Sequence, residues 1–212
     1  MKLFAPIIVL IFSFIVGCAG KVEYTQPLSN YKVNNTLIIN KQKDEVWKQV
    51  IKSLGNSFFI INNMDKESGF INVSYSGDPE KYIDCGQIYS YVKNAKGERI
   101  YRFAGSKSFM QYESFENGNV LVFHNRKMDL DGRVNIIISD IDSNSTLITI
   151  NTKYVVTKII DMNAYGGMSK HMNDSISFTT NGRARFPNVE TECAATGVLE
   201  TDILNALTQN IN

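Results

Sequence analysis

The first twenty residues, MKLFAPIIVLIFSFIVGCAG, constrain this chain more than any other stretch. After Lys2, residues 4–16 form a nearly unbroken apolar run, shorter than the ~20 residues that a helix needs to cross a bilayer. Small residues then lead into Cys18, and Lys21 brings the first charge after the run. A basic residue, a short apolar stretch and a cleavage region follow one another in this order in an export signal. The mature chain is therefore expected to begin at Cys18.

Residues 15–18, Ile-Val-Gly-Cys, resemble the lipobox of bacterial lipoprotein signal peptides. The resemblance implies that residues 1–17 are removed and that Cys18 becomes lipidated, with palmitate-like acyl chains holding the protein on the membrane. An uncleaved anchor helix is disfavoured because the apolar run ends early. An ordinary signal peptide is disfavoured because residues 16–18 make a poor A-x-A cleavage site. Ala19, in place of an aspartate, implies the cell outer membrane, with the folded domain in the periplasm.

Composition excludes some classes of partner. Lys2 is the only charge in residues 1–17, so 22 Lys and Arg fall to 21 against 21 Asp and Glu in the remaining 195 residues. A near-neutral chain of this kind lacks the basic footprint of a nucleic-acid-binding protein. Its apolar content of 43% is enough for a core, and its length suits one domain.

The chain has three cysteines, and assigning Cys18 to lipid leaves Cys85 and Cys193 as a pair. In an oxidising compartment the pair predicts a disulfide that closes a loop of about 109 residues, 85 to 193 inclusive. Such a disulfide is worth roughly 4–5 kcal/mol by loop entropy. The alternative is two buried thiols that behave as small apolar side chains.

Residues 18–35 are predicted to be the lipidated cysteine and a polar tether, because residues 19–35 lack a period of 2 or 3.6. A flexible coil of this length spans roughly 20–25 Å. The domain that follows, residues 36–212, would then lie near the membrane and pivot on it.

Hydrophobic patterning predicts strands in the middle of that domain and a helix near each end. The first helix, residues 44–54, has an apolar stripe and is followed by Gly55; the last has apolar residues every four positions from Leu199 and Thr196 as its N-cap. Strands are predicted at 36–39, 58–61, 70–75, 88–92, 100–103, 120–124, 133–141, 146–160 and 175–186. Turns or loops are predicted at 62–69, 76–84, 94–97, 129–132, 142–145 and 161–174.

This order predicts an α+β fold: a curved antiparallel sheet with an N-terminal helix, and a C-terminal helix packed across it, as in helix-grip domains. Residues 44–47, Asp-Glu-Val-Trp, and residues 65–71, Asp-Lys-Glu-Ser-Gly-Phe-Ile, resemble the opening of outer-membrane lipoproteins with a grip domain like that of BamC, a subunit of the β-barrel assembly machinery. The chain departs from that family in having room for one grip domain, where the family has two. Trp47 lies in a regular apolar stripe, which favours a role in the core over a role in ligand binding.

No constellation of catalytic or metal-binding residues is found. His124 and His171 lack partners at ligand spacing and are predicted to be surface or loop residues. Ser169 and His171 do not form a G-x-S-x-G motif, and a dyad of residues two apart on a loop is disfavoured. Residues 129–132, Asp-Leu-Asp-Gly, lack the remaining ligands of a calcium loop and are predicted to be a β-turn. We therefore expect no enzyme, no metal and no cofactor.

The expected function is that of a membrane-anchored structural or accessory component of a cell-envelope complex, with a protein partner in the envelope. The alternative is a binder of a small apolar ligand, held in a cavity between the sheet and the C-terminal helix. Six aromatic residues could line such a cavity: Phe58, Phe59, Tyr89, Tyr91, Phe103 and Phe109. A third and less favoured possibility is a surface-exposed adhesin or hydrolase.

Overall fold

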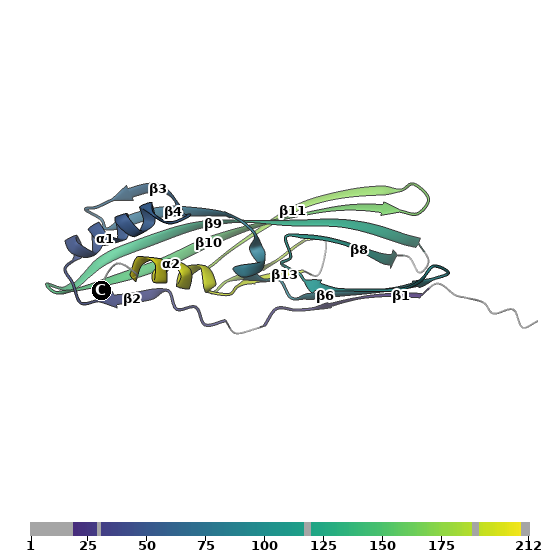
Figure 1. Cartoon of the computed structure of the whole chain (residues 1–212), viewed down its shortest axis with the longest axis horizontal. Coiled ribbons are helices and arrows are strands. Elements are labelled where there is room, and N and C mark those ends of the chain that lie inside the picture. The colour runs from purple at the N-terminus through teal and green to yellow at the C-terminus, as the bar shows by residue number, and fades with distance from the viewer. Residues whose placement is uncertain (1–18, 29–30, 117–119, 188–190, 209–212) are drawn as a thin grey trace, which may run out of the picture.

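Two long antiparallel strands organise the molecule. The computed structural model describes residues 19–28, 31–116, 120–187 and 191–208. In it β9 (Val120–Asp142) and β10 (Ser145–Ala164) pair along almost their whole length and give the molecule its elongated shape (Figure 1). Inward and outward side chains alternate along both strands, as expected for strands with one covered face. The two ends of this ladder are covered differently, which divides the molecule into two halves.

The central sheet has the strand order β11-β10-β9-β4-β3, with β2 also on β10 and β8 also on β9. Its additional strands are β2 (Thr36–Ile39), β3 (Ile60–Asp65), β4 (Phe70–Gly77), β8 (Phe109–Glu116) and β11 (Ser169–Thr179). All of these pairings are antiparallel.

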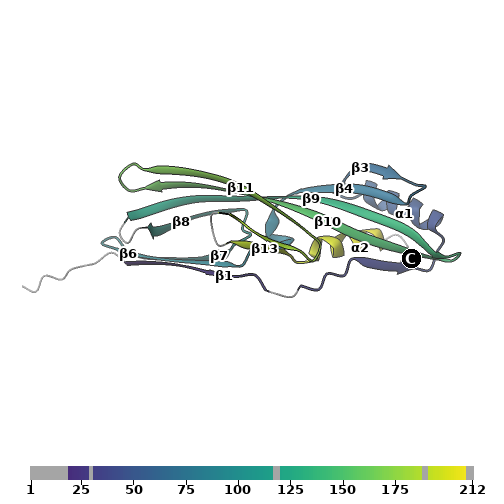
Figure 2. The same cartoon turned by 180° about the vertical axis from the view of Figure 1, so that it is seen from behind.

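Two helices cover one face of the sheet in what we call the helical half, the half that contains the β9–β10 turn. They are α1 (Lys43–Gly55) and α2 (Val198–Thr208), and they lie side by side at that end (Figures 1 and 2). Asp44 and Glu45 lie in the first turn of α1, where the helix dipole favours negative charge. Aliphatic side chains fill the interface between helices and sheet: Val46, Val50, Ile136, Ile138, Ile148, Ile150, Leu199, Ile203 and Leu207.

The opposite half, the β half, is covered by further strands. A sheet of β1 (Ala19–Thr25), β6 (Gln87–Asn94) and β7 (Gly97–Ala104) lies against β8. Between the halves, β5 (Ile83–Asp84), β12 (Arg183–Arg185) and β13 (Glu192–Ala195) form a small sheet beside the short 3₁₀ helix η1 (Pro79–Lys81). Among the described residues, neither helix is long and apolar enough to cross a membrane.

The predicted fold class is wrong. Strands account for 62% of the described residues and helices for 15%, and the strands form three sheets, so the fold is mostly β and resembles a sandwich. The prediction of an α+β helix-grip domain failed because the helices cover only half of the β9–β10 ladder. The other half is covered by β1, β6 and β7, and local patterning does not show which strands belong to a second sheet.

The predicted tether is instead built into the fold. Ala19–Thr25 forms β1, which pairs with β6 along its whole length. Farther along, Val33 is buried and the Asn35 side-chain amide donates a hydrogen bond to the Ile150 carbonyl at 2.9 Å. We call residues 19–35 the strap, of which residues 29–30 lie outside the described part. Its alternation is weak because six of the seven residues of β1 are exposed and only Tyr24 is partly buried.

The predicted turns are also strand in whole or in part, most clearly at three places. Residues 129–132 continue β9 without a break, residues 161–174 contain the ends of β10 and β11, and β3 extends to Asp65. Gly132 favoured a turn in the sequence, but its role in the fold is to leave room for α2. A Cβ at this position would lie 3.1 Å from the Leu199 side chain. The first helix, the strand at 36–39 and the apolar stripe of the last helix are confirmed.

Candidate functional site

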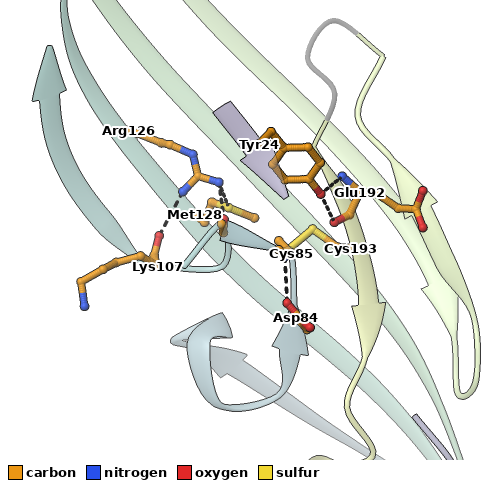
Figure 3. Close-up of a disulfide and its surroundings, with 10 residues drawn as sticks. Tyr24, Asp84, Cys85, Lys107, Arg126, Met128, Glu192 and Cys193 are labelled. Atoms are coloured by element: carbon orange, nitrogen blue, oxygen red, sulfur yellow. Dashed lines mark hydrogen bonds between the residues drawn. A yellow bond between two sulfur atoms is a disulfide. The ribbon is translucent and has the colours of Figure 1, made fainter. Parts of the chain in front are cut away.

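The predicted disulfide is confirmed. Cys85 and Cys193 are joined, and both are fully buried. Cys85 lies between β5 and β6, and Cys193 lies on β13, so the bond fastens the β half to the small sheet before α2 (Figure 3). Cys18 and the signal peptide, residues 1–17, lie outside the described residues.

The strap is fastened on both sides of the disulfide. The Tyr24 hydroxyl donates to the Glu192 carbonyl at 3.1 Å and accepts from the Glu192 amide at 2.9 Å (Figure 3). Asp84 accepts hydrogen bonds from the Tyr31 hydroxyl at 2.7 Å and from the Leu28 amide at 3.2 Å. Burial, followed by the bond to Asp84, raises the pKa of Tyr31 to about 12, so its hydroxyl stays protonated. The segment after Cys18 is therefore held by side chains as well as by strand pairing.

A buried basic row, His124, Arg126 and Lys158, occupies the interior of the β half. Each of these side chains is at most 6% exposed, on inward-facing positions of β9 and β10. The Arg126 guanidinium donates to the backbone carbonyls of Gly105 and Lys107, and burial lowers its pKa to about 10 (Figure 3). It is thereby hydrogen-bonded without a carboxylate partner among the described residues.

Lys158 is the least satisfied member of the basic row. Its Nζ has no hydrogen-bond acceptor among the described residues and lies 4.0 Å from the centre of the Phe186 ring, a cation–π contact. Asp174 is its cross-strand neighbour on β11 and favours its charged form. Burial, aided by the charge of Arg126, nevertheless lowers the pKa of Lys158 to about 8. Lys158 is thus a buried charge that costs stability.

His124 is buried, which corrects the prediction of a surface residue. Its Nε2 lies 2.7 Å from the Ser114 hydroxyl, and its ring stacks on Tyr112 with the ring centres 4.4 Å apart. Its Nδ1 has no hydrogen-bond partner within the described ranges. Burial lowers the pKa of His124 to about 4, so the ring is neutral at pH 7. His171, by contrast, is exposed on β11, where its Nδ1 lies 2.6 Å from the Asp161 carboxylate.

An apolar pocket opens at the far end of the β half, beside residue 19. It has a volume of about 660 Å³, within the range of small-molecule sites. The lining comes from the β6–β7 turn, β7, β8, the start of β9 and the β10–β11 turn: Asn94, Ala95, Lys96, Arg99, Glu113, Phe115, Val120, Leu121, Phe123 and Tyr165. A Cβ on Gly20 would lie 2.6 Å from the Phe115 side chain, so β1 runs directly beside this pocket.

A second surface lies on the helical half, on the face of the sheet opposite the helices. A groove of about 540 Å³ there is lined mainly by polar residues of β3, β4 and β9, including Asn62, Asn72 and Arg133. Beside it, β3 is an edge strand and exposes Ile60 and Met64. A bulge at residues 61–63 interrupts its pairing with β4, a feature common in edge strands.

The cavity expected between the sheet and α2 is filled by side chains. Leu199, Ile203 and Leu207 are completely buried there. Glu200 is also fully buried and accepts hydrogen bonds from the Tyr154 hydroxyl at 2.7 Å and the Thr180 hydroxyl at 2.8 Å. The six aromatic residues proposed to line a cavity are spread over both halves, and Phe58 and Phe109 are exposed.

The basic row and the apolar pocket were missed from sequence. The alternation of His124, Arg126 and Met128 could have placed their side chains on one face, but only the tertiary structure shows that this face is covered. Among the described residues, no group of three or more His, Cys, Asp or Glu side chains is placed to hold a metal ion. Comparison with family models, curated proteins and solved structures finds no match to this chain.

Proposed function

We propose that this chain is a lipoprotein of the bacterial outer membrane, acylated on Cys18, whose periplasmic domain is a non-catalytic accessory component of a cell-envelope complex. The main support is that the strap begins one residue after the lipobox cysteine. Because β1 is paired along its whole length, an acylated Cys18 would be attached to the rigid domain with little slack. The local resemblance of residues 44–47 and 65–71 to BamC-like lipoproteins agrees with this compartment.

The surface that we assign to a protein partner is the outer face and edge of the helical half. It combines an edge strand, two exposed apolar side chains and a polar groove with Arg133 and Asp131. Edge strands are common sites for adding a strand from a partner. This surface is also at the opposite end of the ladder from β1, where a partner would not compete with the bilayer (Figure 2).

Acylation is tested first. The full chain is expressed in a Gram-negative host, and the mass of its N-terminal peptide is measured together with incorporation of labelled palmitate. We expect cleavage before Cys18, a triacylated peptide and flotation with outer membranes, all absent in Cys18→Ala. Processed protein with an unmodified Cys18 would contradict the anchor.

The partner surface is tested by a photo-crosslinking amino acid placed at Met64 on the β3 edge. A matched control carries it at Gln111, an exposed position on β8 in the other half. We expect one discrete protein adduct from position 64 and none from position 111, and we expect Ile60→Asp to abolish the adduct. Equal adducts at both positions, or none at either, would contradict a specific partner at this edge.

A further inference from the structure

The end of the β half beside residue 19 exposes large apolar side chains on the turn between β10 and β11. Tyr165 is 81% exposed and Met168 is 68% exposed. Gly166 and Gly167 separate them, with φ of 113° and 92°, values that favour glycine and allow so tight a turn. Phe123, at the start of β9, is 42% exposed and lines the apolar pocket together with Tyr165. We call this group of Phe123, Tyr165 and Met168 the tip.

Two lysines lie close to the tip. Lys96 is exposed on the β6–β7 turn and lines the same pocket as Tyr165. Lys170 is exposed two residues beyond Met168. Tyrosine has an apolar ring and a polar hydroxyl, which suits it to the boundary between headgroups and acyl chains. Lysine near an anionic bilayer surface contributes about 1 kcal/mol of attraction. The composition of the tip is thus that of a surface in contact with lipid.

The position of the tip favours contact with lipid over contact with a protein. Ala19 pairs with Lys93, one residue before the pocket-lining Asn94. Cys18 is covalently next to Ala19, about 3.8 Å away between Cα atoms. A diacylglyceryl group on Cys18 would therefore enter the bilayer beside the tip, and the pairing of β1 with β6 would leave little freedom for the domain to swing away.

We propose that the tip is a second membrane contact: Tyr165 and Met168 insert into the interfacial region of the same bilayer that holds the Cys18 lipid. This inference rests on the proposed acylation of Cys18. Two contacts at one end would set the long β9–β10 ladder upright and hold the helical half away from the bilayer. β9 has 23 residues, which at about 3.3 Å each gives a reach on the order of 70 Å.

The test uses the single tryptophan of the chain as its own control. Trp47 lies on α1 in the helical half and is 7% exposed. The wild-type lipoprotein and the variant Trp47→Phe/Tyr165→Trp are reconstituted into vesicles of phosphatidylethanolamine and phosphatidylglycerol whose acyl chains are brominated. Bromine quenches tryptophan fluorescence only at close range. A third variant, Trp47→Phe/Ile60→Trp, reports on the exposed edge of the helical half.

We expect at least twofold quenching for Tyr165→Trp, relative to unbrominated vesicles, and less than 10% for the other two proteins. Quenching at none of the three positions, or equal quenching at positions 165 and 60, would overturn the proposal. The N-terminal mass, measured on the same samples, separates the two ideas. An acylated protein without quenching at position 165 refutes the tip alone, whereas an unmodified Cys18 refutes the anchor.

Discussion

The two halves of the β9–β10 ladder differ in the side chains that they bury on the inner face of the sheet. In the helical half most inward positions of the ladder are aliphatic and fully buried, as at Ile136 and Ile150, and two helices cover them. In the β half the inward positions include His124, Arg126 and Lys158, and strands and a disulfide cover them. Burial of apolar area stabilises the first half directly, whereas the second must offset the desolvation of charged groups.

This difference agrees with the separate roles that we propose for the two halves. The helical half has a core that can support a rigid outer face and edge for a partner. The β half is fastened by hydrogen bonds from the strap and by the Cys85–Cys193 bond, next to the residue that we propose is acylated. We expect the two halves to respond differently to reduction, to core truncation and to pH.

Reduction of the disulfide should have the largest effect. Opening a loop with a sequence separation of 108 residues should lower the free energy of unfolding by roughly 4–5 kcal/mol. Urea unfolding of the oxidised and the reduced, alkylated protein measures this, and Cys85→Ala/Cys193→Ala should match the reduced form. Hydrogen exchange should speed up first in β5, β6 and β13. A loss below 1 kcal/mol would mean that the β half does not depend on this bond.

Truncation of the helical core should come next. Ile203 is completely buried on α2, so Ile203→Ala should cost about 3 kcal/mol through lost burial and a residual cavity. Ile141, which is half exposed near the β9–β10 turn, supplies the control, and Ile141→Ala should cost less than about 0.5 kcal/mol. Similar losses for the two variants would contradict the packing described for α2.

Replacement of the buried lysine should have the opposite sign. Lys158→Met keeps the volume and removes a charge whose pKa is lowered to about 8, so we expect a stabilisation of about 2 kcal/mol at pH 7. Lys153→Met, at an exposed position of the same strand, should leave thermal unfolding unchanged. Destabilisation by Lys158→Met would show that its contacts with Phe186 and Asp174 outweigh its desolvation.

The smallest effect should be the response of His124 to acid. Its pKa is about 4 in the folded chain and about 6.5 when unfolded, so the unfolded chain binds the proton more readily between these values. Its contribution to stability is complete above pH 6.5 and falls as the pH approaches 4, by about 1 kcal/mol at pH 5.5. The free energies of unfolding of wild type and His124→Gln, measured in urea at pH 7.5 and 5.5, test this: only wild type should lose this stability at the lower pH.

Sequence reasoning succeeded where local pattern and tertiary environment agree. The stripe of Val46, Trp47 and Val50 predicts α1 because a helix shows in the spacing of nearby apolar residues. The cysteine count predicts the disulfide because two cysteines remain once Cys18 is assigned to lipid. It failed at Gly132 and in the strap. In the sequence, a glycine within a strand is read as a turn, because the helix that packs against it is not visible there. The alternation in β1 is too weak to predict that it pairs with β6. The tip could not be found because it joins turns that are far apart in sequence.

The most direct test of the account is the height of the protein above a supported bilayer. Neutron reflectometry on the acylated full chain, bound through its own lipid to a phosphatidylethanolamine and phosphatidylglycerol bilayer, measures the thickness of the protein layer. An upright molecule that contacts the bilayer at Tyr165 and Met168 predicts a layer on the order of 70 Å, the length of the β9 ladder. A layer of about 30 Å, the thickness of two packed sheets with their side chains, would mean that the molecule lies flat and would contradict the separation of anchor and partner surface.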